Sequence, residues 1–389
     1  MRNSVLIMAL GAAIAPSAFQ SLAQEVSVDA GATVVASAMD REGEGGDSSL
    51  LFDAFVGLEV DHVFDSGLEI GGALEVRAQK DTASRPGFAA SYPTPYPRIG
   101  PAPSSGLMLG LDTFDVDLTT GMERAYVYLK SGWGEVSAGR DVGVAVRLDA
   151  RPPTINSMAS ATSPRLDPNG AAFVRARNDV TGPSAKVSVV SSRLVGFKAG
   201  VSFTPTADAR GVDFYNTSAR SPDGAQLENV AEAALSFSYR FRSSGLKVRA
   251  GLTGVWADSS ENRSVFGSYE AYGAGFELDK DDWSGGVRWL NSNNAVRTGQ
   301  ADYSAFEAGV VRKLGDWRIG LEYGRATDDF LGLEGESTAV GVSKKVNDSF
   351  EIGLSYLDSH TKWRESPLLA PNGQISSGNG VLVEMSVRK

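Results

Sequence analysis

The fold is decided by residues 125–141, which read AYVYLKSGWGEVSAGRD. The pair Ser131-Gly132 divides this stretch into two segments of strand length, so we expect two antiparallel β-strands joined by a tight turn. The register of the second strand stays open, because Gly132 and Gly134 can bend a strand or admit a bulge. A long segment, residues 142–182, follows directly. The sequence therefore predicts a β-hairpin that leads the chain into a long loop.

A period of two, apolar then polar, continues through almost the whole chain after Gln24. Four windows show it most clearly, and their apolar positions are Leu68, Ile70, Leu74 and Val76; Leu235, Phe237, Tyr239 and Phe241; Leu246, Val248, Leu252 and Trp256; and Trp317, Ile319, Leu321 and Tyr323. Polar residues and glycine occupy most positions between them. Helical spacing fits none of these windows, so the chain is predicted to be all-β.

The connections between the strands separate a membrane barrel from a soluble sandwich, since both architectures have one apolar face. Seven connections are very short: Asp65-Ser66, Ser131-Gly132, residues 193–195, Ser243-Ser244, residues 280–282, Gly315-Asp316 and Asn347-Asp348. Long polar or Gly/Pro-rich links alternate strictly with them, at residues 80–117, 142–182, 205–229, 258–266, 291–301 and 359–378. Short turns on one side and long loops on the other are typical of outer-membrane barrels. We therefore predict a transmembrane antiparallel β-barrel of about sixteen strands, each about ten residues long, which is enough to cross a bilayer when tilted.

Aromatic side chains support the same architecture. Trp283, Trp317 and Phe350 directly follow short turns on the apolar face, and Phe197 does so as well. A belt of such rings is expected where a membrane meets water.

Composition and the first residues exclude several types of site and partner and indicate export. The chain has 389 residues and no cysteine, which excludes disulfides, thiol nucleophiles and thiolate metal sites. Its net charge of −10 argues against nucleic acid as a partner. Residues 1–23 have the basic start, apolar stretch and small-x-small end of a signal peptide. We expect export, with residues 24–389 forming one barrel domain.

The polar face of the strands is expected to line the lumen. It carries charges at Glu69, Glu75, Arg77, Arg240, Arg249, Glu277, Arg288, Glu307, Arg318, Glu322 and Glu351. Charges are rare in packed cores, and about sixteen strands leave a water-filled channel. This predicts passive diffusion of small hydrophilic solutes and ions. The alternative is a structural or adhesive barrel plugged by residues 142–182, although a plugged barrel need not keep so many lumen charges.

The segments RAYVYL, residues 124–129, and GEVSAGRD, residues 134–141, resemble the Gram-negative general porins, the alphaproteobacterial branch above all. The resemblance implies that they form the fourth and fifth of sixteen strands. It also implies that residues 142–182 are the third loop, which folds into the barrel and narrows it. A homotrimer in the outer membrane of a Gram-negative bacterium, in contact with lipid and lipopolysaccharide, is implied as well. The C-terminus departs from the family, because Val387-Arg388-Lys389 lacks the usual terminal aromatic residue. Either the assembly signal is a variant, or the natural C-terminus lies elsewhere.

The resemblance also points to the narrowest part of the pore. The candidate residues are Asp141, Arg147, Asp149, Arg151 and Asp167 on the loop side, and Arg77, Arg124 and Tyr126 on the nearby wall. Acidic residues on the loop opposite basic residues on the wall would create an electric field across the pore. The alternative is that these charges are solvated or form salt bridges that hold the loop. Mixed charges predict weak selectivity, and the sequence leaves its sign open.

Two further hypotheses concern metal ions and catalysis. Asp167-Pro168-Asn169-Gly170 is typical of a turn whose oxygen atoms could hold calcium, although the spacing does not match an EF-hand loop. We expect no resident cofactor. An enzyme in barrel form would need a histidine base near a nucleophile or carboxylate. The two histidines, His62 and His360, are expected on opposite sides of the membrane, so no catalytic site is predicted.

Overall fold

The computed structural model describes residues 25–41, 45–81, 103–104, 118–168, 174–208, 226–259, 266–297, 301–330, 332–363 and 375–389. The predicted signal peptide, residues 1–23, lies outside these ranges, and so does Asn169-Gly170 of the possible calcium turn. In the described ranges, no helix is long and apolar enough to cross a membrane.

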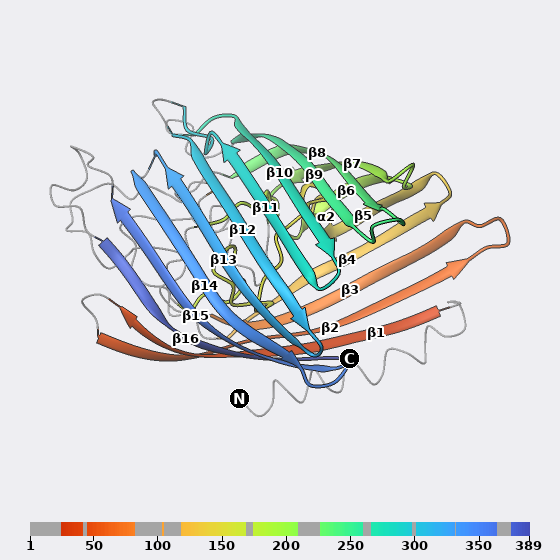
Figure 1. Cartoon of the computed structure of the whole chain (residues 1–389). Coiled ribbons are helices and arrows are strands. Elements are labelled where there is room, and N and C mark those ends of the chain that lie inside the picture. Colours follow the sequence, from red (N-terminus) through yellow and green to blue (C-terminus); the bar gives the residue numbers. More distant parts are fainter. Residues whose placement is uncertain are drawn as a thin grey trace.

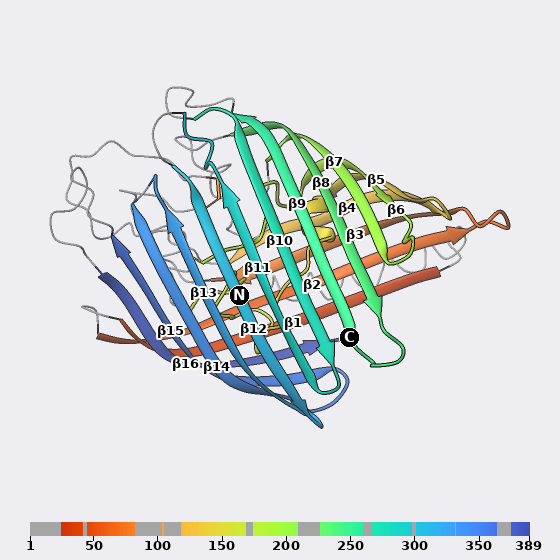
Figure 2. The same cartoon turned by 45° about the horizontal axis from the view of Figure 1, so that its top comes forward.

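Sixteen strands make up the described fold. They are β1 (Glu25–Arg41), β2 (Gly45–Val63), β3 (Glu69–Lys80), β4 (Thr119–Ser131), β5 (Gly134–Asp141), β6 (Ser184–Ser191), β7 (Phe197–Thr206), β8 (Leu227–Arg240), β9 (Lys247–Ser259), β10 (Tyr269–Lys280), β11 (Trp283–Ser292), β12 (Tyr303–Leu314), β13 (Trp317–Asp328), β14 (Leu333–Lys345), β15 (Phe350–Trp363) and β16 (Ile375–Arg388). A single helical turn, α2 (Val144–Arg147), lies within the barrel (Figure 1). Each strand pairs antiparallel with its neighbours, and β1 pairs with β16 (Figure 2). The predicted closed all-β barrel is thus confirmed.

The predicted short turns are confirmed at one end of the barrel. All seven join consecutive strands, from the β2–β3 turn to the β14–β15 turn. Gly67, Gly245 and Gly315 adopt positive φ in three of these turns, a conformation that glycine enters without steric cost. The predicted strict alternation with long links is wrong at the other end of the barrel in two places. Only residues 42–44 separate β1 from β2, and only residues 329–332 separate β13 from β14. In the first case the two strands are 17 and 19 residues long, so continued pairing takes the place of a loop.

The two faces of the strands differ as the alternation predicts. Large apolar side chains on the outward face are exposed, among them Val127, Leu252, Trp317, Leu321 and Val387. The inward face carries charges, but many of these are buried, including Arg77, Arg288, Glu307, Glu322 and Glu384. The prediction that the inward charges face the water of an open channel is therefore wrong for this part of the wall. Another segment of the chain covers it.

The apolar core lies inside the barrel, between this covering segment and the wall. One cluster joins the loop residues Val174 and Val180 to Tyr269 of β10 and Tyr303 of β12. A second cluster joins the loop residue Leu166 to residues of β1, β2, β14, β15 and β16. The described parts of this segment, residues 142–168 and 174–182, are thus held in the lumen by packing on two sides.

Candidate functional site

The covering segment, residues 142–182 and here named the lumen loop, lies directly against the wall where the wall residue is glycine. In the described part of this loop, Ala150 packs on Gly275 of β10, and Pro153 packs on Gly309 of β12. A Cβ atom on either glycine would overlap the carbonyl oxygen of its loop partner. Glycine at these inward positions therefore lets the two backbones approach closely.

Glutamates of the wall hold the loop through its main chain. Glu384 of β16 accepts hydrogen bonds from the N–H groups of residues 157–159, at 2.8, 3.1 and 2.9 Å. Glu322 of β13 accepts them from the N–H groups of Ile155 at 2.6 Å and Ala161 at 2.8 Å. Hydrogen bonds to a carboxylate are about twice as strong as neutral ones. They fix the path of the loop without using its side chains.

The two ends of the lumen loop are tied together by Lys186 of β6, which is buried. Its Nζ donates to the carbonyl oxygens of Asp141 at 2.6 Å and Gly182 at 2.7 Å, and to Thr181 Oγ1 at 3.2 Å. The Thr181 hydroxyl in turn donates to Glu232 of β8 at 2.6 Å. These bonds close the base of the loop.

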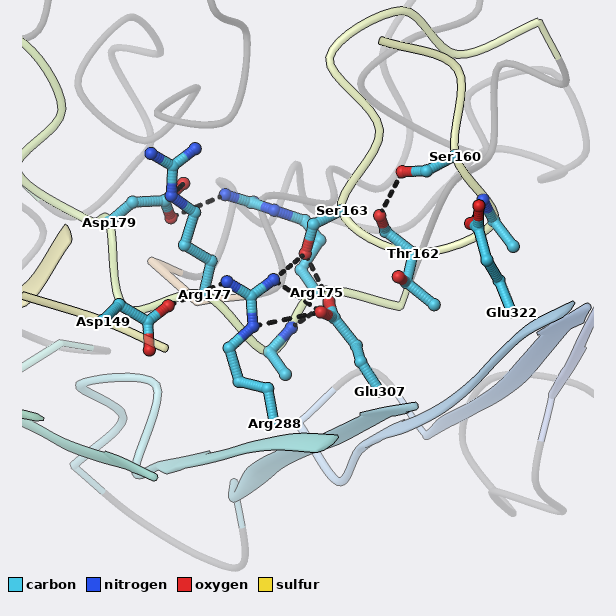
Figure 3. Close-up of polar contacts among 12 residues, drawn as sticks. Asp149, Ser160, Thr162, Ser163, Arg175, Arg177, Asp179, Arg288, Glu307 and Glu322 are labelled. Atoms are coloured by element: carbon cyan, nitrogen blue, oxygen red, sulfur yellow. Dashed lines mark hydrogen bonds and ion pairs between the residues drawn. The ribbon is translucent and has the colours of Figure 1, made fainter. Parts of the chain in front are cut away.

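A buried ion cluster fixes the middle of the loop to the wall (Figure 3). Arg288 of β11 donates to Asp149 of the loop at 2.8 Å and to Glu307 of β12 at 3.0 Å. Glu307 also accepts a hydrogen bond from the Ala176 N–H at 2.8 Å. The side chains of Arg288, Asp149 and Glu307 are 5%, 9% and 1% exposed. Burial raises the pKa of the Asp149 carboxyl, and the Arg288 guanidinium opposes this shift.

Two cavities flank the described part of the loop. The larger has a volume of about 560 Å³, and its charged lining residues are Asp149, Arg151, Arg165, Arg177, Arg249, Glu277, Arg288, Glu307, Arg318, Glu351 and Glu384. The smaller has a volume of about 200 Å³ and is lined by Glu75, Arg77, Glu123, Arg124, Arg165, Arg177 and Asp179, among others. Val146, Arg165 and Arg177 line both cavities, so the cavities adjoin at these residues.

Comparison with known proteins identifies the class of this barrel. The sequence model of the Gram-negative porin family matches residues 4–359, which is most of the chain. The chain is a Gram-negative porin. It forms a channel for passive diffusion across the outer membrane, as the sequence predicts. No curated protein sequence matches it significantly.

Solved structures of other porins share the fold of this porin at low sequence identity. OmpF of Salmonella typhi, in complex with daunomycin, aligns with a TM-score of 0.57 at 12% identity, covering 93% of this chain and 97% of that one. The anion-selective porin from Comamonas acidovorans aligns with a TM-score of 0.53 at 13% identity, covering 94% and 100%. The trimer form of OmpT from Vibrio cholerae aligns with a TM-score of 0.54 at 12% identity, covering 93% and 100%.

The structure brings two of the predicted loop residues, Asp149 and Arg151, to the larger cavity of the porin. Asp149 is buried against Arg288, whereas the Arg151 side chain is exposed in the lumen. The predicted wall residues Arg77 and Arg124 line the smaller cavity.

The wall residues of the smaller cavity are engaged in ion pairs. Arg77 is buried and donates to Asp53 at 2.6 Å. Arg124 lies 3.3 Å from Asp141, and its guanidinium is 5.8 Å from the centre of the Tyr126 ring. Asp141 and Tyr126 do not line either cavity themselves. These pairs fit the alternative interpretation, in which the candidate charges form salt bridges.

Two further predicted residues, Arg147 and Asp167, also line neither cavity. Arg147 pairs with Glu135 of β5 at 2.6 Å. Asp167 is 2% exposed, and its N–H donates to Asp81 at 2.8 Å. Within the described ranges, no group of three or more side chains suited to a metal ion is present.

Both sides of the larger cavity carry charges of both signs. The described part of the loop contributes Asp149 and the exposed Arg151, and the wall contributes arginines as well as carboxylates: Arg249, Arg288, Arg318, Glu277, Glu351 and Glu384. The one pair of a loop acid and a wall arginine there, Asp149 and Arg288, is in direct contact.

Sequence reasoning left several of these residues unassigned to the site. Alternation places Arg288 and Glu307 on the inward face, but it gives no sign of which inward charges the loop reaches. A usable signal was the row of inward glycines on neighbouring strands, Gly275, Gly286 and Gly309, which marks where a backbone can approach.

Proposed function

We propose that the constriction of this porin lies between the lumen loop and the wall, and that it favours small anions over cations. The observation that carries this proposal is an imbalance in pairing. The carboxylates at the larger cavity are engaged by positive groups or N–H donors, whereas the Arg151 guanidinium is not paired with any residue in the described ranges. A passing ion therefore meets an unbalanced positive charge.

The carboxylates of the larger cavity are engaged as follows. Glu277 pairs with Arg249, and Glu351 pairs with Arg318 at 3.1 Å. Glu384 accepts three loop N–H groups, as described above. A carboxylate held in this way attracts a mobile cation less than a free one, because its field is partly cancelled at close range.

Two arginines of the loop, Arg151 and Arg177, are less completely balanced. Arg151 forms no ion pair or hydrogen bond with any residue that the structure describes, and it is exposed in the lumen. Arg177 lies 3.9 Å from Asp179, whose carboxylate is closer to Arg175, at 3.0 Å. Partial dehydration of Arg151 inside the lumen lowers its pKa, and the neighbouring Arg177 and Arg288 lower it further. Arginine nevertheless stays charged at neutral pH, so both side chains act as fixed cations.

The remaining predicted residues have a supporting role in this proposal. The ion pairs of Arg77, Arg124, Asp141 and Arg147 shape the wall and the start of the loop. Asp167 fixes the C-terminal end of the loop segment 142–168 through the hydrogen bond from its N–H to Asp81. We assign no catalytic role, because His62 lies near the short-turn end of β2 and His360 near the opposite end of β15.

The sign of selectivity gives a direct test. In a planar lipid bilayer under a salt gradient, we expect stepwise conductance and a reversal potential of the anion-selective sign. Replacing Arg151 by glutamine should lower the anion-to-cation permeability ratio about fivefold. One charge ~8 Å from the ion path in water attracts an anion by ~0.5 kcal/mol and repels a cation by ~0.5 kcal/mol, and both contributions are lost. A cation-selective wild-type channel would contradict the proposal, and absent conductance would favour the plugged barrel.

We also propose that the porin is a homotrimer whose outward face contacts outer-membrane lipid and lipopolysaccharide. The trimer form of OmpT has the same fold, and Ala30, Ala32 and Ala36 give β1 a smooth outward stripe suited to close packing. Light scattering of the protein in detergent should give three chains per particle. A mass of one chain per particle, at a concentration that keeps function, would refute the trimer.

A further inference from the structure

We propose that Arg151 and Arg177 form a saturable binding site in this channel for small oxyanions with two negative charges, of which inorganic phosphate is the simplest. This inference rests on the proposed anion preference and deepens it, because it adds a bound state to a general field. Three structural features support it. They are a rigid mount for Arg151, the approach of a second arginine, and a cavity large enough for the ion.

The backbone that carries Arg151 is fixed on both sides. Ala150 before it packs on Gly275, and Pro152 and Pro153 follow it. Proline fixes φ, and it also restricts the residue before it, which here is Arg151. The two prolines lie against Gly286 and Gly309 of the wall. Because this backbone segment is rigid before binding, little conformational entropy of the main chain is lost when an anion binds.

Arg177 brings a second positive charge to the same space. It lines the larger cavity together with Arg151, and it also lines the smaller one. Figure 3 shows its guanidinium beside Asp179, above the cluster of Asp149 and Arg288. Its proximity is one cause of the lowered pKa of Arg151. Two like charges that face the same partly dehydrated cavity repel each other, and an anion between them relieves this repulsion.

The chemistry of the guanidinium group selects the class of ligand. Its planar fork makes two parallel hydrogen bonds to phosphate or carboxylate oxygens, which chloride, with a single atom, cannot match. Two arginines match two charges. Arg165 also lines both cavities and adds a third positive group. The cavity volume of about 560 Å³ exceeds that of a small hydrated oxyanion.

The test measures chloride current through single channels while inorganic phosphate is added at about pH 8, where phosphate is mainly a dianion. We expect the current to fall and then to saturate as phosphate occupies the site. Arg151→Gln or Arg177→Gln should raise the phosphate concentration for half-block about tenfold, the usual effect of one charge-assisted hydrogen bond. Arg151→Lys keeps the charge but loses the fork, so we expect it to weaken the block as well.

A matched control removes the same charge from the same cavity. Arg249 lies in the larger cavity but pairs with Glu277, so Arg249→Gln changes only the general field of the cavity and should raise the half-block concentration much less than Arg151→Gln. Heat-dependent migration on gels confirms that each variant is folded. The site is refuted if wild type shows no saturable block, or if Arg249→Gln weakens the block as much as Arg151→Gln. An anion-selective channel without block would leave the proposed function intact, whereas a cation-selective reversal potential would overturn the proposed function itself.

Discussion

Replacement of Arg288 by methionine is expected to release the lumen loop from the wall and to destabilise the folded protein by about 3–5 kcal/mol. The physical reason is the isolation of Arg288 from water. Its side chain is 5% exposed, and it is the partner of both Asp149 and Glu307. Without it, two carboxylates are left close together and buried. Relief then requires that one of them takes up a proton or that the loop leaves the wall, and both cost free energy at neutral pH. Urea unfolding followed by tryptophan fluorescence gives the loss of stability.

The same variant has a second readout in the loop itself. We expect trypsin to cut the released loop while the barrel stays intact, and the open-channel current to fluctuate. The matched control is Arg325→Met on the outward face of β13, where the arginine also contacts two glutamates, Glu334 and Glu336, but is half exposed. Such a pair is screened by solvent, so the control should behave as wild type. Equal effects of Arg288→Met and Arg325→Met would show that burial of the cluster does not matter.

Replacement of Gly275 by alanine is expected to push the lumen loop inward and to lower the single-channel conductance. The new methyl group would overlap the Ala150 carbonyl oxygen, which cannot move without the loop backbone. Overpacking of this kind costs about 1–3 kcal/mol, although alanine is otherwise the better strand residue. Conductance and urea unfolding should therefore both change.

The control for this variant is Gly285→Ala on the neighbouring strand β11. Its Cβ would face outward, and the nearest atom would be the Gly309 carbonyl oxygen at 3.9 Å. We expect wild-type conductance and stability for Gly285→Ala. Unchanged conductance for Gly275→Ala would mean that the loop does not rest on the wall as described.

The barrel could be predicted from sequence because its determinants are local. In β13, Trp317, Ile319 and Leu321 alternate with charged residues and glycine, and Gly315-Asp316 marks the turn before them. Each strand of this kind then pairs with its neighbour in the chain, so local patterns determine the global topology. The exceptions were the short β1–β2 and β13–β14 connections, where extended pairing continues to the rim and nothing in the alternation marks how far it runs.

The path of the lumen loop could not be predicted in the same way. Asp149 and Arg288 are 139 positions apart, and no local pattern links them. The bonds from Glu322 and Glu384 go to main-chain N–H groups, which every residue except proline has, so the loop sequence does not reveal them. Inward glycines are ambiguous before the structure is known, since a glycine in a strand can equally mark a bulge or a bend.

The anchoring of the lumen loop by its main chain has a consequence for how such a channel can diversify. Because the wall glutamates bind N–H groups, the loop keeps its course when an exposed side chain such as Arg151 is exchanged. The charge presented to permeating ions can then change by single substitutions, with little effect on folding. Related channels that inherit the same glutamates and glycines can therefore evolve opposite ion preferences while their barrels stay alike.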